Sequence, residues 1–267
     1  MDFIIILYII LGILPSLVWL LYYLRKDAHP EPRRMILAVF FWGALSTIPV
    51  LFLQLGLNKI LDFSLKNLQL PALEKILDLS WSSLNPSYLA VALIYWFLII
   101  SFSEELFKYL VIRIKVVGSQ HLDEPLDVML YMVVAALGFT AVENILYLFL
   151  PASQLSLELL INRSLVISFT RFIGATFLHT LCSATVGYYM ALSLCRTKNK
   201  AMYIFSGMFI AVALHGLYDF SIMTLEGSLK IALPAAILII LAFLVFSEFE
   251  KLKKLKSVCQ LSKKLKK

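Results

Sequence analysis

Residues 88–112 read YLAVALIYWFLIISFSEELFKYLVI, an apolar run interrupted by two carboxylates and an ammonium at positions 104, 105 and 108. A charged side chain costs roughly 2.5–3.5 kcal/mol to insert at membrane depth. On a helix, Lys108 lies at i,i+4 from Glu104 and at i,i+3 from Glu105, so it can neutralise either carboxylate. If these three residues only held helices together through charge pairing, one of the two carboxylates would remain without a cation. We therefore expect this segment to face protein or water and to carry a function.

The composition is typical of a membrane protein with many spans. Of the 267 residues, 61% are hydrophobic and 15% are charged, and the mean hydropathy is +0.87. A soluble domain cannot bury that much apolar surface. The net charge of +7 is spread over the segments between and after the apolar runs, so we expect no nucleic-acid partner.

Seven apolar runs are long enough to cross about 30 Å of hydrocarbon as helices. The predicted fold is all-α, a polytopic bundle with spans near residues 3–24, 35–57, 88–114, 125–150, 161–194, 201–223 and 229–246. The first run lacks a basic segment before it and a small-x-small cleavage site, so we expect it to be retained. Residues 1–250 then form one transmembrane domain with its catalytic core at 88–223, followed by a basic tail at 251–267.

The distribution of basic residues predicts the orientation of the bundle. The links after the first, third and fifth spans, together with the tail, hold 17 of the 24 Lys and Arg residues, whereas the opposite links hold five. The positive-inside rule then places the N-terminus outside and the C-terminus in the cytosol. The alternating Lys and Leu residues of the tail indicate a helix that lies on a surface of anionic lipids.

Further polar residues gather in the fourth, fifth and sixth spans, whereas the first, second and seventh hold essentially none. They are Glu143 and Asn144 in the fourth, Arg171 and His179 in the fifth, and His215 and Asp219 in the sixth. The last pair is spaced i,i+4, so the carboxylate can orient the imidazole. Each pair alone is explained by hydrogen bonds between helices. Together with the acidic pair, they supply the groups that activate water and stabilise an oxyanion.

The order of these motifs resembles the PrsW family of intramembrane proteases, which are related to CAAX prenyl proteases and bacteriocin-processing enzymes. The matching residues, over about positions 100–220, are Glu104-Glu105-x-x-Lys108, Phe139-x-x-x-Glu143-Asn144, His179 and His215-x-x-x-Asp219. CAAX-type members usually carry an arginine one position after Lys108 and a histidine in place of Glu143-Asn144. These departures place the chain nearer PrsW and argue against a prenylated substrate.

The resemblance implies a hydrolase of the bacterial cytoplasmic membrane. Its substrate would be a single-span or otherwise membrane-anchored protein, such as an anti-sigma factor. By the same resemblance, Glu104 would be the general base, with Glu105 as its partner. His179 and His215 would complete the catalytic set, one assisting the water and one the oxyanion. The supporting residues would be Lys108, Glu143, Asn144, Arg171 and Asp219.

Two other interpretations use the same residue types. Two histidines and a carboxylate with water form an ordinary catalytic zinc set, for which the candidates are Glu143, His179, His215 and Asp219. The sequence lacks His-Glu-x-x-His, so we expect no cofactor, with zinc as the alternative. A transporter or proton relay would also carry acids and histidines, but repeat symmetry and broken helices are not evident.

A single site requires its residues to meet at one depth. At 1.5 Å per residue, Glu143 lies about 27 Å from Pro125, whereas Glu104 lies only about 14 Å from Arg113. The third span is therefore predicted to stay helical from about residue 90 through Lys115, with its basic residues snorkelling. The side chains expected in one cavity, in the outer half of the membrane, are Glu104, Glu143, His179 and His215.

Overall fold

The computed structural model describes residues 2–25, 31–150, 156–195 and 198–255, and within these ranges every regular element is helical. The elements are α1 (Asp2–Leu24), α2 (Arg33–Leu45), α3 (Thr47–Asn67), α4 (Leu73–Leu77), η1 (Trp81–Ser83), α5 (Pro86–Leu93), η2 (Ile94–Ser101), α6 (Phe102–Lys115), α7 (Pro125–Leu148), α8 (Leu157–Ile173), α9 (Ala175–Cys195), α10 (Lys200–Thr224) and α11 (Leu229–Leu255). The predicted all-α class is confirmed.

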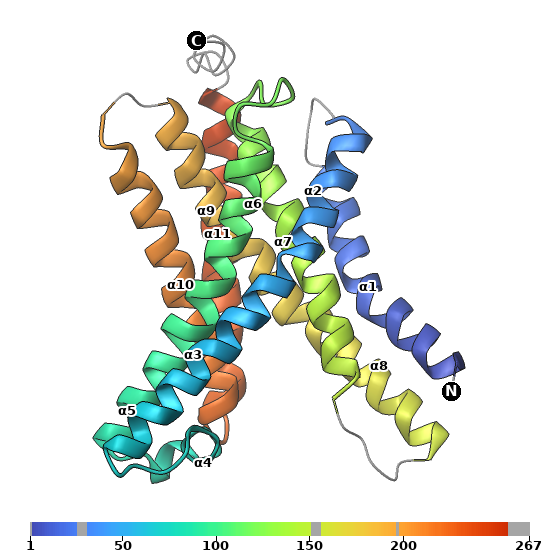
Figure 1. Cartoon of the computed structure of the whole chain (residues 1–267). Coiled ribbons are helices and arrows are strands. Elements are labelled where there is room, and N and C mark those ends of the chain that lie inside the picture. The colour runs from blue at the N-terminus through green and yellow to red at the C-terminus, as the bar shows by residue number, and fades with distance from the viewer. Residues whose placement is uncertain (1, 26–30, 151–155, 196–197, 256–267) are drawn as a thin grey trace.

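Seven stretches of helix within the described ranges are long and apolar enough to cross a membrane, which is the predicted number. Figure 1 shows the start of α1 and the end of α11 at opposite ends of the bundle. The C-terminal ends of α1, α6 and α9 lie at the same end as that of α11. The links predicted to be basic thus leave from one end, although the side that faces the cytosol stays a prediction. Helix α11 continues to Leu255, and the remainder of the predicted tail, residues 256–267, lies outside the described residues.

Helix α7 forms the centre of the bundle, where other helices bury most of its residues. Its backbone approaches that of α2 closely because glycines occupy the crossing. A methyl group at Gly138 would overlap the carbonyl oxygen of Phe40, and one at Gly43 would overlap that of Ala135. Small residues permit such close approach between membrane helices. Polar residues on α7 are therefore surrounded by other helices rather than by lipid.

The second span consists of two helices rather than one. Helix α2 ends before Ser46 and α3 begins at Thr47, where both hydroxyls donate to carbonyls of the preceding turn, at 2.6 and 2.7 Å. Such back-bonding bends helices. Pro49, the predicted kink, lies in the first turn of α3 just beyond the break. Helix α3 also continues to Asn67, ten residues past the predicted end.

The fifth span is also divided, into α8 and α9, at Gly174, whose φ of −92° and ψ of −93° leave the helical region. Its amide still donates to the carbonyl of Thr170 at 2.9 Å, which closes the last turn of α8. The predicted single helix over 161–194 is therefore wrong in its continuity. The consequence is local, because Arg171 lies in the last turn of α8 and His179 begins the second turn of α9.

The third span is helical from Pro86 through Lys115, as predicted. Its middle third, η2, is π-helical, with a hydrogen bond from the Ser101 hydroxyl to the carbonyl of Trp96 at 2.6 Å. π-Helical turns are rare and often mark functional sites. The wider turn sets the rotation of α6, whose first turn carries Glu104.

Candidate active site

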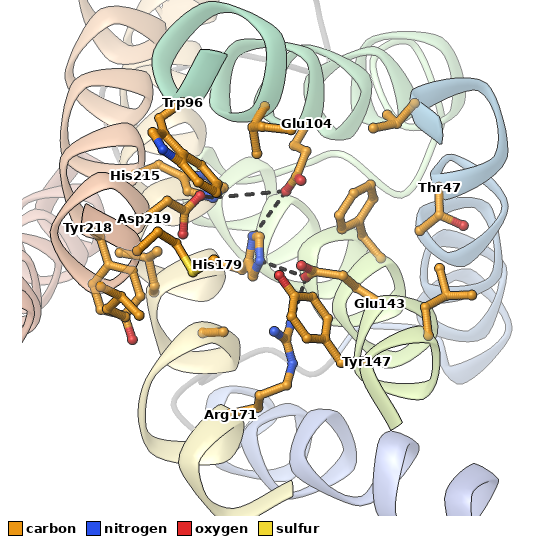
Figure 2. Close-up of a pocket in the computed structure, with 18 of the residues that line it drawn as sticks. Thr47, Trp96, Glu104, Glu143, Tyr147, Arg171, His179, His215, Tyr218 and Asp219 are labelled. Carbon is orange, nitrogen blue, oxygen red and sulfur yellow. Dashed lines mark ion pairs between the residues drawn. The ribbon is translucent and has the colours of Figure 1, made fainter. Parts of the chain in front are cut away.

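A cavity of about 690 Å³ lies among α3, η2, α6, α7, α8, α9 and α10 (Figure 2). Its lining includes Glu104, Glu143, His179 and His215, the residues predicted to share one cavity. They come from four different spans, so their meeting is a product of helix packing. The predicted convergence is observed, whereas the chemical role of each residue stays a prediction.

Lys108 is fully buried beside two residues that line the cavity, Glu104 and His179. Its ammonium donates to Oε1 of Glu105 at 2.8 Å and to Nδ1 of His179 at 2.7 Å, and it lies 3.6 Å from Oε2 of Glu104. An ammonium can only donate, so Nδ1 of His179 accepts and the proton of that ring belongs on Nε2. Lys108 therefore determines the tautomer of His179 as well as neutralising the acidic pair.

Glu105 is fully buried, and both of its carboxylate oxygens have partners. Besides Lys108, Oε1 faces Nδ1 of His215 at 3.0 Å, and Oε2 accepts a hydrogen bond from the Ser183 hydroxyl at 3.1 Å. Charge-assisted hydrogen bonds of this kind hold side chains firmly. Glu105 thus joins α6 to α9 and α10 and holds His215 in position.

Glu104 differs from its neighbour because Oε2, although buried, has no hydrogen-bond partner among the described residues. This oxygen lies 3.9 Å from Nδ1 of His179 and 3.9 Å from Nε2 of His215. Both distances exceed a direct hydrogen bond. A separation of this size is where a bridging water or an ion is expected. Glu104 is consequently the carboxylate that is open to a reacting group.

Each histidine has a carboxylate beside it. Oε2 of Glu143 lies 2.9 Å from Nε2 of His179, and Oδ2 of Asp219 lies 3.3 Å from Nε2 of His215. The two imidazole rings stand perpendicular, with centroids 4.8 Å apart. A carboxylate beside a histidine orients the ring and sets its tautomer. Figure 2 shows both pairs directed into the cavity.

Arg171 lines the cavity, and Asn144 holds it in place. The amide oxygen of Asn144 accepts from Nε of Arg171, and its nitrogen donates to Oγ1 of Thr176 at 3.1 Å and to the carbonyl of Gly12 at 3.3 Å. Arg171 also lies 2.9 Å from Oε2 of Glu143. Asn144 therefore ties α7 to α1, α8 and α9, and Arg171 neutralises Glu143 as Lys108 neutralises Glu105.

The cluster contains more negative than positive side chains. Its carboxylates are Glu104, Glu105, Glu143 and Asp219, and its permanent cations are Lys108 and Arg171. Unpaired buried charge is costly. Both ring nitrogens of His215 face carboxylates, Nδ1 that of Glu105 at 3.0 Å and Nε2 that of Asp219 at 3.3 Å. A divalent cation would supply the two positive charges that Lys108 and Arg171 leave lacking.

The donor atoms also suit a metal ion, although not the set expected from the sequence. Glu104, His179 and His215 each offer a ligand atom within 4.8 Å of the others. Two imidazoles and one carboxylate with an open position are an ordinary zinc set. Glu143 and Asp219, expected among the ligands, instead flank the two imidazoles. Glu104 takes their place in the group.

Several residues of the site were not predicted, among them Gln54, Ser183 and Tyr147. Nε2 of Gln54 lies 3.1 Å from Oγ of Ser103 and 3.5 Å from Oε1 of Glu104, so the second span contributes to the site after all. Ser183 and Tyr147 each follow a predicted residue by four positions on the same helix. An amide in an apolar run and polar residues at i+4 were the signals that could have revealed them.

Comparison with known proteins agrees with this geometry. The family model described as PrsW family intramembrane metalloprotease matches residues 31–247. A PrsW protease from Clostridioides difficile is 28% identical over 217 residues, which cover 80% of this chain and 78% of the relative. The PrsW protease of Bacillus subtilis is 27% identical over 225 residues, covering 84% and 86%. No solved structure matches the chain.

The family match spans all the polar motifs of the site, from the acidic pair on α6 to the histidine and aspartate on α10. It also spans six of the seven membrane-crossing stretches almost completely. The relatives match over most of their own length, so the similarity concerns the whole membrane domain. The chain belongs to the PrsW family of intramembrane metalloproteases, and it is a multi-pass membrane protease.

Proposed function

We propose that this protease cuts a membrane-anchored protein, such as a single-span anti-sigma factor, with a water molecule activated by Glu104. One observation carries the proposal: Oε2 of Glu104 is buried without a hydrogen-bond partner, 3.9 Å from both histidines, in a cavity inside the bundle. A water molecule placed between these groups would be near a base and near hydrogen-bond donors at once.

The surrounding residues serve the other steps of peptide hydrolysis. As the oxygen of water adds to the scissile carbonyl carbon, a proton of that water passes to Glu104 and the carbonyl electron pair moves to its oxygen. The proton on Nε2 of His215, which lies 3.3 Å from Asp219 while Nδ1 is held by Glu105, is shared with that oxyanion and stabilises it. His179, neutral and held at its two nitrogens by Lys108 and Glu143, forms the wall of the site beside that water. Glu104 then returns its proton to the leaving amide nitrogen as the carbon–nitrogen bond breaks.

The position of the cavity supports a substrate that sits in the membrane. Apolar side chains such as Val50, Ile100 and Ile222 line much of its wall, which suits a hydrophobic segment. Glu143 lies five residues before the end of α7, toward the end of the bundle where α1 begins. In the predicted orientation, the cut falls in the outer half of a bacterial cytoplasmic membrane, and the basic C-terminal tail contacts anionic lipids on the inner side.

Zinc is the second candidate for activating the water, and two observations favour it. The matched family is described as a metalloprotease, and the surplus of carboxylates would be balanced by a dication. Glu104, His179 and His215 would hold the ion. Bound zinc acts as a Lewis acid and makes water more acidic. Lys108 would have to release Nδ1 of His179 for that nitrogen to bind the ion.

The test compares membranes from cells that produce the wild-type chain with membranes from cells that produce Glu104→Ala, by mass spectrometry of their peptides. Fragments of one or more membrane-anchored proteins should appear only with the wild type, and their ends give the cleavage site. Removal of a general base costs on the order of 10²–10⁴-fold in rate. Equal fragment patterns, with both variants inserted at equal levels, would refute the proposal. Ion flux in proteoliposomes without cleavage would indicate a transporter.

A further inference from the structure

Tyr147 carries a hydroxyl group that the rest of the site leaves unused. The residue lines the cavity from α7, four positions after Glu143 and on the same face of that helix. No residue in the described part of the chain forms a hydrogen bond with its hydroxyl, whereas the other polar groups around it are engaged with one another. Tyr147 is 43% exposed, and part of that exposed surface faces the cavity that it lines. A donor left open in a cavity is therefore suited to a ligand.

The ring of Tyr147 is held in one orientation. The guanidinium carbon of Arg171 lies 3.9 Å from its ring centroid, and Arg171 is itself fixed by Glu143 and Asn144. A cation stacked on an aromatic face stabilises this arrangement. Figure 2 shows the ring reaching from α7 toward the centre of the cavity, with its hydroxyl on the side of His179 and the Glu143 carboxylate. The donor is thus placed before a substrate arrives.

We propose that Tyr147 is a catalytic residue, whose hydroxyl donates a hydrogen bond to the carbonyl oxygen of the scissile peptide as that oxygen becomes negative. The inference rests on the proposed protease chemistry and adds a second donor to His215, from the opposite wall of the cavity (Figure 2). A donor that is fixed in advance costs no reorganisation during the reaction, and the cation against its ring strengthens the hydroxyl as a donor. No proton leaves Tyr147 in this role.

The test is Tyr147→Phe, which removes one oxygen atom and keeps the ring that stacks on Arg171. A fluorogenic peptide carrying the cleavage site found in the membrane comparison serves as substrate, with the full-length protein in detergent. We expect kcat to fall about 10²-fold, the usual effect of losing one oxyanion donor, while KM changes less than twofold. A phosphinic peptide of the same sequence, which imitates the tetrahedral intermediate, should bind correspondingly more weakly to the variant.

The matched control is Tyr131→Phe on the same helix, because the Tyr131 hydroxyl is buried against Glu31, away from the cavity. We expect this control to lower thermal stability without lowering kcat. An unchanged kcat in Tyr147→Phe, or a change confined to KM, overturns the role of Tyr147. A wild-type protein that cleaves no peptide and yields no fragments in the membrane comparison overturns the proposed function instead, so the two failures are distinct.

Discussion

The glycine that divides α8 from α9 gives a sharp test of how the site is positioned. A methyl group at Gly174 would overlap the hydroxyl of Tyr218 and lie 2.9 Å from the carbonyl oxygen of Thr170. Arg171 and His179 lie on the two sides of this break, and both contact the same oxygen of Glu143 at 2.9 Å. Gly174→Ala should therefore displace one of them from Glu143.

The size of the effect follows from the overlap. Forcing a methyl group into a packed site costs about 1–3 kcal/mol. If the strain is relieved by moving α8 against α9, the active arrangement becomes roughly 5- to 140-fold less populated, since 1.4 kcal/mol is a factor of ten. The fluorogenic peptide assay should show a loss of kcat in that range, and a thermal unfolding curve in detergent gives the accompanying loss of stability.

Two matched variants make this prediction refutable. Gly56→Ala on α3 adds the same methyl group where nothing lies within 4 Å, so it should retain activity. Tyr218→Phe removes the overlapping oxygen and leaves the ring carbon at 3.7 Å, an ordinary contact, so it should partly rescue Gly174→Ala. The rescue is incomplete because the carbonyl of Thr170 stays in place. Equal activity in Gly174→Ala and Gly56→Ala would show that the break does not position the site.

Three further changes test the charges, the second span and the metal. Lys108→Met leaves Glu105 and Nδ1 of His179 without their shared donor. Because breaking a buried ion pair costs about 3–5 kcal/mol, peptide cleavage at neutral pH should be lost. Full activity in this variant would show that the charged cluster has no role in catalysis. Gln54→Met removes the amide beside Glu104 and should lower kcat about tenfold. The control Leu51→Met, one turn earlier on the same cavity wall, should not lower kcat. Equal rates in the two variants would show that Gln54 does not support Glu104. Exhaustive chelation should leave activity intact if Glu104 acts as the base, and a loss restored by added Zn²⁺ would make Glu104, His179 and His215 metal ligands.

The sequence alone determined the membrane class, the number of spans and the four motifs that meet in the cavity. Insertion of each span depends on its own hydropathy, which is a local property and can be read from the chain. The cost of a buried charge is equally local, which is why Glu104, His179 and His215 stood out in apolar runs. Their order along the chain was specific enough to indicate the family, and the comparisons confirm it.

The tertiary structure decided which residues of the cluster pair with each other and which one faces the cavity. Spacing along the chain allowed Lys108 to pair with either acid, but packing leaves Glu105 enclosed and Glu104 open. Likewise, Glu143 and Asp219 looked like metal ligands in sequence and lie instead beside the histidines they orient. The rotation of each helix about its axis determines these contacts, and that rotation depends on how the helices pack around α7.

The contact of Gln54 with Glu104 and the break in the helix at Gly174 were likewise decided by the packing of helices, not by the local sequence. An amide in an apolar span has no sequence neighbour that reveals its purpose, because its partners are 49 and 50 residues away. A glycine in a membrane helix usually permits close packing, and the position of Tyr218 on another helix shows why this one leaves no room for a methyl group. Hydropathy fixes which segments enter the membrane, whereas contacts between distant residues fix how each segment is bent and turned once it is there.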